Sequence, residues 1–585
     1  MIEYPVLKEQ PSFRQVVDTF KGYHHNLRIG ANEFYEMENM TSEDYPVLSV
    51  RGPRGRTSIA WDGACLGAYY VPGIGLYHVQ EYDGDSSVRL LKPTGEDVLL
   101  HYHALNAKPK QFALMGKRLI IAPDMKAVEI GSSDMIHLSD TWQCNTGTVE
   151  LRMCDANGNL YEGVTAAAKP PSAPGYHDLW LCTAVGDVGL RQYEPASSQW
   201  VSISTTYLKL TGLGDHHFEA GDGIHISGLA GAATSLNGSY VLQQAGHGDL
   251  VITGVIFAPY TQDCAATPVT IERKVPELDF IVESGNRLWG CSNERNELYA
   301  CKLGDPKNWN CFQGLSTDSW VASIGTPGAF TGAVVQSGYP IFYKEDCKHK
   351  VWPSSTGAHQ LTATPCNGVE KGSCNSLAVL GGTVFYKSGF GICADDGGGP
   401  VEIGHCLGSV EYHNACGAVH DRKYYVCMRD SDEKSHLFVY DMARKLWHRE
   451  DSTYTDCLAA GGGGVFLASG GDLWDLTGST GTPEGPVSWM VQTGDLGLEI
   501  PEQKYISRLT LRASLDPGAT LEIYAQYDRE PAWVKLGQVY GTSLRSFSLP
   551  VRPRRCDQLR LRLQGTGMCK IYSITKTLEK GSELS

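Results

Sequence analysis

The densest cluster of side chains that could bind a metal ion occupies one short stretch of the sequence. It contains Asp215, His216, His217, Glu219, Asp222 and His225. A zinc site needs three or four such groups that converge on one point. Adjacent side chains of a strand point to opposite faces of the sheet, so His216 and His217 cannot easily converge. We therefore predict a polar loop here and no metal site in the chain.

A second stretch begins like a calcium-binding loop. Asp155, Asn157 and Asn159 stand at the spacing of the first three ligands, but Leu160 replaces the usual glycine and Ala166 replaces the closing glutamate. We predict a hairpin turn at this position.

The sequence lacks the common motifs of covalent and phosphate chemistry. It contains no GxSxG elbow, no GxxxxGK[ST] loop and no complete GxGxxG. The segment Ser316 to Trp320 resembles the Asp box of some propeller hydrolases, but it lacks the glycine and its tryptophan comes too early. We predict no catalytic residue, no cofactor and a chain that is not an enzyme.

Three arginines, Arg51, Arg54 and Arg56, form the basic cluster nearest the N-terminus. They could contact DNA or an acidic neighbouring subunit, or belong to a solvated surface. A ring partner is a reasonable target, so we predict them as a possible interface.

The elements that must position these residues are short strands. Seven apolar or aromatic runs follow a turn, with anchors at Leu76, Leu119, Leu288, Ile341, Val384, Tyr424 and Val465. The steps between anchors are 43, 169, 53, 43, 40 and 41 residues. Four-stranded propeller blades repeat at roughly 40 to 50 residues. The spacing predicts an all-β protein with a seven-bladed β-propeller, six or eight blades being the alternatives.

The long step and a change of pattern near Pro483 divide the chain. We expect an N-terminal arm over 1–55, blades 1 and 2 over 56–140, an inserted β domain over 141–274 and blades 3 to 7 over 275–482. Strict alternation, as in Gln558 to Leu563, predicts a C-terminal β-sandwich over 483–585. Helical periodicity is nearly absent, and Phe13 to Phe20 is the best short candidate.

The composition excludes some classes of protein. The net charge of -15 does not favour binding to DNA or to an acidic membrane. Residues Met1 to Pro5 do not begin a signal peptide, and no apolar stretch approaches the roughly 18 to 20 residues that span a bilayer. The 18 cysteines are scattered, so we expect reduced, buried thiols. The chain should be made in the cytoplasm, with no membrane insertion.

The N-terminal segment resembles a known family. The residues that carry the resemblance are Phe20 to Ile29, Glu33 to Met40, Tyr45 to Arg51, and Arg54. They resemble the start of bacteriophage tail proteins of the packaged-DNA stabilisation type, also called tail nozzle or hub proteins. The middle, through Asn296 to Trp309 and Leu446 to Asp451, is similar to proteins encoded in prophages of gut Firmicutes. One departure is the wider spacing between Gly22 and Asn26.

The resemblance implies a ring-shaped homo-oligomer in the virion tail, with a hexamer as the expected count. The ring would lie below the portal and adaptor proteins, be assembled in the bacterial host cytoplasm, and let genomic DNA pass transiently during ejection. An acidic chain suits a conduit that must not bind its cargo.

Two other hypotheses stay open. The chain could be a host-recognition protein at the tail tip that binds surface glycan through the insertion or the sandwich. It could also be a glycan-degrading propeller enzyme. Such an enzyme needs two carboxylates about 5 to 9.5 Å apart in space, a distance that sequence does not reveal.

Overall fold

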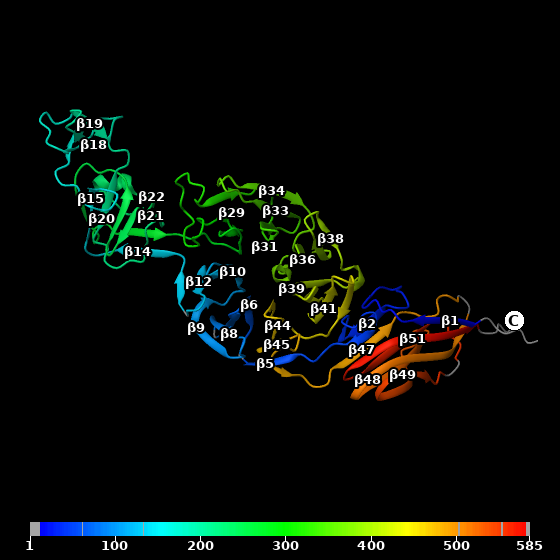
Figure 1. Cartoon of the computed structure of the whole chain (residues 1–585). Coiled ribbons are helices and arrows are strands. Elements are labelled where there is room, and N and C mark those ends of the chain that lie inside the picture. The colour runs from blue at the N-terminus through cyan, green and yellow to red at the C-terminus, as the bar shows by residue number, and fades with distance from the viewer. Residues whose placement is uncertain are drawn as a thin grey trace, which may run out of the picture.

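A computed structural model describes residues 12–60, 63–82, 84–132, 134–500, 503–551 and 554–580. Met1 to Pro5, on which the signal-peptide prediction depends, and the rest of 1–11 lie outside the described residues. The chain forms three bodies in a row: a projecting insertion, a propeller, and a β domain that contains both ends of the described chain (Figure 1). Among the described residues, no helix has the length and apolar character needed to cross a bilayer.

The propeller has seven four-stranded antiparallel blades. The strands of blades 1 to 4, in order, are β6 (Cys65–Val71), β7 (Gly75–Tyr82), β8 (Asp85–Leu91) and β9 (Asp97–Asn106); β10 (Gln111–Met115), β11 (Arg118–Ala122), β12 (Lys126–Glu129) and β13 (Met135–His137); β27 (Phe280–Glu283), β28 (Leu288–Ser292), β29 (Glu297–Ala300) and β30 (Trp320–Ser323); and β31 (Gly332–Gln336), β32 (Tyr339–Tyr343), β33 (Cys347–Trp352) and β34 (Gln360–Pro365).

Blades 5 to 7 complete the ring. Their strands are β35 (Ala378–Leu380), β36 (Thr383–Ser388), β37 (Gly391–Asp395) and β38 (Pro400–Glu402); β39 (Tyr412–His420), β40 (Lys423–Asp430), β41 (Ser435–Asp441) and β42 (Leu446–Arg449); and β43 (Cys457–Gly461), β44 (Gly464–Ser469), β45 (Asp472–Asp475) and β5 (Gly55–Ala60), with the short β46 (Thr482–Pro483) beside β5. The 3-10 helices η2 (Cys374–Ser376) and η3 (His405–Leu407) lie between blades 4 and 5 and between blades 5 and 6.

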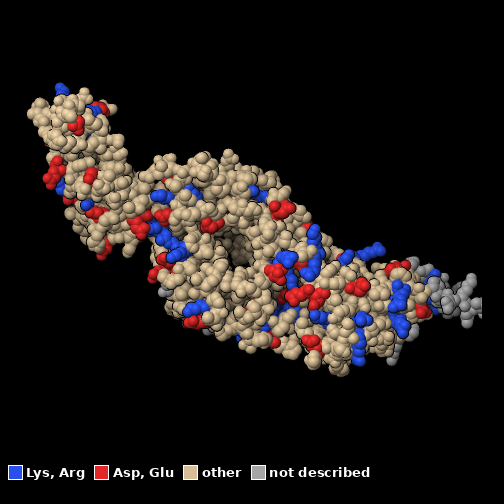
Figure 2. All heavy atoms as spheres, viewed as in Figure 1, with Lys and Arg blue, Asp and Glu red and all other residues tan. Residues whose placement is uncertain are grey.

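The seven-blade prediction is confirmed, and each anchor residue lies in the second strand of its blade. The first strands of successive blades contact one another around the whole ring, and β43 contacts β6 to close it. Figure 2 shows the ring with a hollow at its centre and with acidic and basic side chains interspersed on the visible face. The inner strands contain many small residues, such as Gly67, Ala113 and Ala459, because space near the axis is limited.

Blade 7 is built from two distant parts of the chain. Its first three strands follow blade 6, but its fourth strand, β5, comes from the segment before blade 1. Asp475 pairs with Gly55, and Trp474 pairs with Arg56. The N-terminal segment therefore closes the propeller.

The insertion consists of three sheets between β13 and β27. They are β14 (Asp140–Cys144), β26 (Val269–Arg273), β21 (Gly223–Ser227) and β22 (Gly238–Val241); β23 (Gln244–Gly246), β24 (Asp249–Thr253), β20 (Tyr207–Thr211), β15 (Thr148–Cys154) and β25 (Tyr260–Asp263); and the distal β16 (Thr165–Ala167), β17 (Leu179–Cys182), β18 (Gly189–Glu194) and β19 (Gln199–Ser202). The 3-10 helix η1 (Gly231–Leu236) packs with the first two sheets.

A disulfide links Cys144 and Cys264 within the insertion, so the prediction of reduced cysteines is wrong for this pair. The other 16 cysteines are free, and most of them are buried.

The predicted C-terminal β-sandwich is confirmed, and the N-terminal segment is part of it. This nine-stranded terminal sheet has the order β2 (Phe34–Glu38), β47 (Ser488–Thr493), β50 (Leu559–Thr566), β48 (Lys504–Tyr527), β51 (Cys569–Lys580), β4 (Leu48–Val50) and β3 (Met40–Thr41), with β1 (Ser12–Val17) on β51 and β49 (Val534–Leu549) on β48. The alternating apolar residues of β48, β50 and β51 face the core, which continues into blade 6 through Phe438 and Trp447.

The short helix candidate Phe13 to Phe20 is wrong. Residues 12–17 form β1, which pairs with β51 from Ser12 opposite Glu579 to Val17 opposite Ile574. Long-range pairing therefore overrides the weak local pattern.

Candidate functional site

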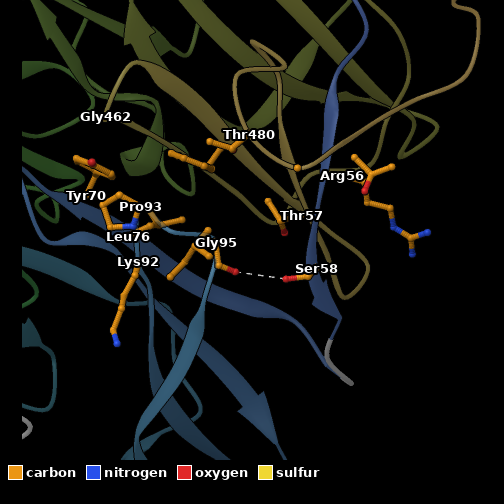
Figure 3. Close-up of a pocket in the computed structure, with 14 residues that line it drawn as sticks. Arg56, Thr57, Ser58, Tyr70, Leu76, Lys92, Pro93, Gly95, Gly462 and Thr480 are labelled. Atoms are coloured by element: carbon orange, nitrogen blue, oxygen red, sulfur yellow. Dashed lines mark hydrogen bonds between the residues drawn. The ribbon is translucent and has the colours of Figure 1, made fainter.

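A pocket of about 260 Å³ lies where the propeller ring closes, between blades 1 and 7. We call it the closure pocket; its lining residues are Arg56, Thr57, Ser58, Tyr70, Leu76, Leu91, Lys92, Pro93, Gly95, Gly462, Phe466, Thr480, Gly481 and Thr482. They come from β5, from blade 1, from the β43–β44 hairpin of blade 7 and from the segment that leads into β46 (Figure 3).

The aromatic part of the pocket depends on two glycines. A Cβ atom at Gly461 would lie 2.1 Å from the Tyr70 ring, and one at Gly462 would lie 2.3 Å from the Tyr70 hydroxyl oxygen. Gly462 also has a φ of +62°, in the left-handed region that favours glycine. The ring of Tyr70 can therefore lie against this turn, nearly parallel to the ring of Phe466, with centroids 6.3 Å apart.

Hydroxyl groups line the opposite side of the pocket. Thr57 donates a hydrogen bond to the carbonyl oxygen of Leu473 over 2.9 Å, and Ser58 donates one to that of Gly95 over 3.4 Å. Thr480 and Thr482 are exposed at the rim. The pocket thus combines an apolar floor with several hydroxyls and glycine backbones.

The charged side chains of the lining point away from the cavity (Figure 3). Arg56 donates to Asp472 over 2.7 Å, and Lys92 donates to Glu96 over 2.9 Å. None of the 14 lining residues is an aspartate, glutamate, histidine or cysteine. The arrangement suits binding of a neutral ligand.

A more polar cavity of about 490 Å³ lies between blades 5 and 6. It is lined by the β36–β37 hairpin and the β38–β39 connection, which lie at the opposite end of the strands from the hairpins of the closure pocket. Three carboxylates, Glu370, Glu402 and Glu411, reach it, and Glu370 is 3.2 Å from the ammonium nitrogen of Lys387. Carboxylates also line a smaller pocket of about 220 Å³, where Glu43, Asp421 and Glu450 lie beside His420 and His448.

The innermost strands of the propeller carry few carboxylates. The first strands of the seven blades carry one carboxylate among them, that of Glu283 at the end of β27. The other carboxylates of the propeller lie on outer strands, such as Asp395 in β37 and Asp475 in β45, or in the connections between strands.

The three N-terminal arginines occupy two different environments. The side chains of Arg51 and Arg54 are 8% and 5% exposed and form ion pairs within the chain, Arg51 with Glu484 and Arg54 with Glu450 and Asp451. Arg56 is 55% exposed and pairs with Asp472. Contact with a neighbouring subunit stays a prediction, and Arg56 is the accessible member of the group.

The histidine-rich stretch of the insertion does not form a metal site. Asp222 is buried and paired with Arg273, whereas His217 is 90% exposed. Across the described residues, no group of three or more His, Cys, Asp or Glu side chains is arranged to hold a metal ion. Asp155 accepts hydrogen bonds from the backbone N–H groups of Asn157 and Asn159, which makes this segment a turn.

The distal sheet of the insertion carries an aromatic cluster. Trp180 and Trp200 meet edge to face at 5.5 Å, and Tyr193 lies 5.4 Å from Trp200. Trp180 is only 4% exposed, whereas Tyr193 and Trp200 are partly exposed, and the core residues of this sheet are Leu181 and Leu190. Tyr176 is the exposed aromatic residue of this lobe, at 76%.

Sequence reasoning missed the closure pocket. Its local signal is the glycine run from Gly461 to Gly464, which indicates a turn and no ligand. Nothing near Tyr70 in the sequence indicates that its ring rests on that turn.

No family model and no curated protein matches the chain. Several solved structures do. An exo-β-1,3-galactanase from Phanerochaete chrysosporium is 9% identical over 51% of this chain and 94% of its own, with a TM-score of 0.22. The endosialidase of phage phi92 is 9% identical over 77% and 69%, with a TM-score of 0.26. An arabinoxylan arabinofuranohydrolase from Bacillus subtilis is 10% identical over 65% and 94%, with a TM-score of 0.19.

These matches contradict our prediction that the chain is not an enzyme, because all three proteins carry the names of glycan-cleaving enzymes. We withdraw that prediction. The likeness is one of fold, and it assigns no reaction or substrate to this chain.

Proposed function

We propose that the chain is a structural protein of a bacteriophage tail, of the nozzle or hub type. The observation that supports this proposal is the place of the residues that carry the family resemblance. The N-terminal residues among them form the joint between the propeller and the terminal sheet. The segment that resembles tail proteins is therefore the one that holds these two bodies together.

On the side of the terminal sheet, the resemblance residues form buried contacts. Met37 and Met40 are 0% and 1% exposed. The side-chain amide of Asn39 donates to the carbonyl oxygen of Ser488 over 2.8 Å and accepts from Arg51 over 2.8 Å. This part of the segment is therefore fixed in the terminal sheet.

On the propeller side, the same segment holds blade 6. The backbone N–H of Tyr23 donates to the carbonyl oxygen of Trp447 over 2.7 Å, and that of His25 donates to Cys406 over 2.7 Å. The ring of Tyr23 lies 5.6 Å from that of Phe438. The propeller and the terminal sheet thus share one hydrophobic core. A rigid connection of this kind is expected of a structural protein that contacts other tail proteins.

The test combines microscopy with mass determination. The purified chain would be imaged by negative stain, alone and mixed with the portal and adaptor proteins of its phage. We expect a ring with an open channel that docks on the portal complex. A particle that never docks there and binds host cells instead would overturn the proposal.

A second candidate function, recognition of a host glycan, is favoured by the closure pocket. A sugar ring has an apolar face and several hydroxyls, and the pocket offers Tyr70 and Phe466 beside the hydroxyls of Thr57 and Ser58 with no charge directed inward. Aromatic and apolar walls with a few polar groups are typical of small-molecule sites.

Glycan binding can be measured with a panel of neutral oligosaccharides in a titration. Thr482→Trp should fill the rim of the pocket and abolish binding. Thr364→Trp, on exposed strand β34 of another blade, is the matched control and should bind like the unmodified chain. Equal binding by all three proteins, or by none, would reject this second candidate.

A further inference from the structure

Part of the terminal sheet is a four-stranded unit with two free edges. Its strand order is β49–β48–β51–β1, and all three pairings are antiparallel. The edge of β1 that faces away from β51 is shared with no other described strand, and the same holds for the edge of β49 that faces away from β48. Within the described part of the chain, the unit therefore presents one unpaired backbone edge on each side.

The β49 edge carries few charges, although three register shifts interrupt its pairing with β48. Lys535 and Arg545 are the only charged residues in this 16-residue strand, and the nine residues between them are all uncharged. Tyr540 and Leu544 are 64% and 42% exposed. Natural proteins normally cover a long edge or place charges and prolines along it, because exposed N–H and C=O groups recruit other strands.

The β1 edge is its counterpart. This six-residue strand contains one charge, Arg14, and no proline, and Phe13 and Val16 are 39% and 52% exposed. It is shorter than the uncharged stretch of β49, so the whole of β1 can lie beside that stretch without meeting Lys535 or Arg545.

The directions of the two edges also match. Because each neighbour in the unit is antiparallel, β49 and β1 run in opposite directions. A copy translated along the sheet would place its β1 antiparallel to the β49 of the preceding copy, which continues the same hydrogen-bonding pattern.

We propose that copies of this chain join head to tail, the β1 edge of one copy pairing with the β49 edge of the next. Such a heterologous contact builds a ring if the rotation closes and a filament if it does not. This inference rests on the proposed tail function, because it names the contact that would join the copies of the ring. The pairing itself is tested by a separate measurement.

The experiment uses two full-length double variants, each with one edge blocked. Gln15→Pro/Val16→Pro blocks β1, and Thr542→Pro/Ser543→Pro blocks β49. Proline lacks the N–H donor, and since successive N–H groups alternate sides along a strand, one of two adjacent prolines always removes an outward donor. Thr362→Pro/Ala363→Pro on the outer strand β34 is the control and should assemble like the unmodified chain.

Mass photometry or sedimentation would report assembly. We expect the unmodified chain to form oligomers, each edge variant alone to be monomeric, and an equimolar mixture of the two to form heterodimers through the one pair of intact edges. A β1 variant that dimerises alone would show pairing of β49 with itself and overturn the proposal. An unmodified chain that stays monomeric at every concentration would also overturn it.

Hydrogen exchange on the unmodified chain covers the case in which a proline variant fails to fold. Amides in 12–17 and 536–544 should exchange more slowly in the assembled than in the diluted protein, and unchanged rates there would count against the pairing. Docking on the portal complex is scored separately, so a ring built through other surfaces would keep the tail function and reject only this contact.

Discussion

The guanidinium group of Arg54 lies 2.6 Å from the carboxylate of Glu450, with both side chains almost fully buried. Arg54 precedes blade 1 in the sequence, whereas Glu450 directly follows the last strand of blade 6. Arg54 also reaches Asp451 at 2.8 Å. Burial raises the pKa of Asp451, but the charge of Arg54 and hydrogen bonds from Thr453 bring it below its ordinary value.

Replacing Arg54 should strongly destabilise the protein. Arg54→Met removes the only cation paired with Asp451 among the described residues and leaves Glu450 with Arg51 alone, at 3.7 Å. The loss of one partner of a buried pair typically costs about 3 to 5 kcal/mol. Arg56→Met removes the exposed pair with Asp472 and should cost less than about 1 kcal/mol. Urea unfolding of both variants measures the difference, and equal costs would contradict this account of the joint.

A methyl group at Gly55 should open blade 7. Its Cβ atom would lie 1.7 Å from the carbonyl oxygen of Thr480, so β5 must move away from β46. We expect Gly55→Ala to lower the free energy of unfolding by about 3 kcal/mol, as for severe overpacking. Gly52→Ala, where nothing lies within 4 Å, is the control and should be nearly neutral. Thermal unfolding of the two variants distinguishes them.

The protein should lose stability in mild acid through His448. Burial, aided by the charge of Lys423, lowers the pKa of His448 to about 3. Neither ring nitrogen has a hydrogen-bond partner among the described residues. Below pH 6.5 the unfolded chain takes up a proton that the folded chain does not, so stability falls as the pH drops toward the folded pKa. At pH 5 the loss from this group should be about 2 kcal/mol.

The measurement is the free energy of unfolding at pH 7 and pH 5. His448→Leu should show a smaller difference between the two values than the unmodified chain. His217→Gln, at a 90% exposed position, should leave the difference unchanged. A His448→Leu variant with the full acid loss would show that the buried imidazole is not its source.

The disulfide of the insertion should stabilise that domain alone. Cys144 and Cys264 are 120 residues apart, and closing a loop of about 100 residues contributes up to about 4.7 kcal/mol in the chain-entropy description. Cys144→Ala/Cys264→Ala should lower the calorimetric transition of the insertion and leave that of the propeller in place. Reduction should reproduce this shift in the unmodified chain and have no effect in the double variant, because the other cysteines are free thiols.

Local patterns were sufficient to predict the blades. Residues such as Leu288 and Tyr424 lie in short apolar runs bounded by turns. The second strand of a blade is apolar along its length because neighbouring blades cover both of its faces. The 169-residue step likewise revealed the insertion, since a repeat with a gap needs no knowledge of the fold inside the gap.

Pairings between distant segments were not predictable in the same way. Gly55 pairs with Asp475, and Phe34 pairs with Thr493. In both pairs, the sequence around one residue does not indicate which distant residue it pairs with. The closure pocket depends on such a pairing, because Tyr70 and Gly462 belong to opposite ends of the propeller sequence. For the same reason Phe13 to Phe20, read alone, suggested a helix, although β51 holds its first part as a strand.

The origin of the fourth strand of blade 7 has a consequence for biosynthesis. Strand β5 leaves the ribosome early, but its partner β45 follows only after roughly 420 further residues, which at about 5 to 20 residues per second takes roughly 20 to 80 seconds. During that interval blades 1 to 6 can form while the ring stays open. The propeller is therefore completed only late in synthesis. A chain truncated before Asp475 lacks the full partner strand of β5 and cannot close the ring.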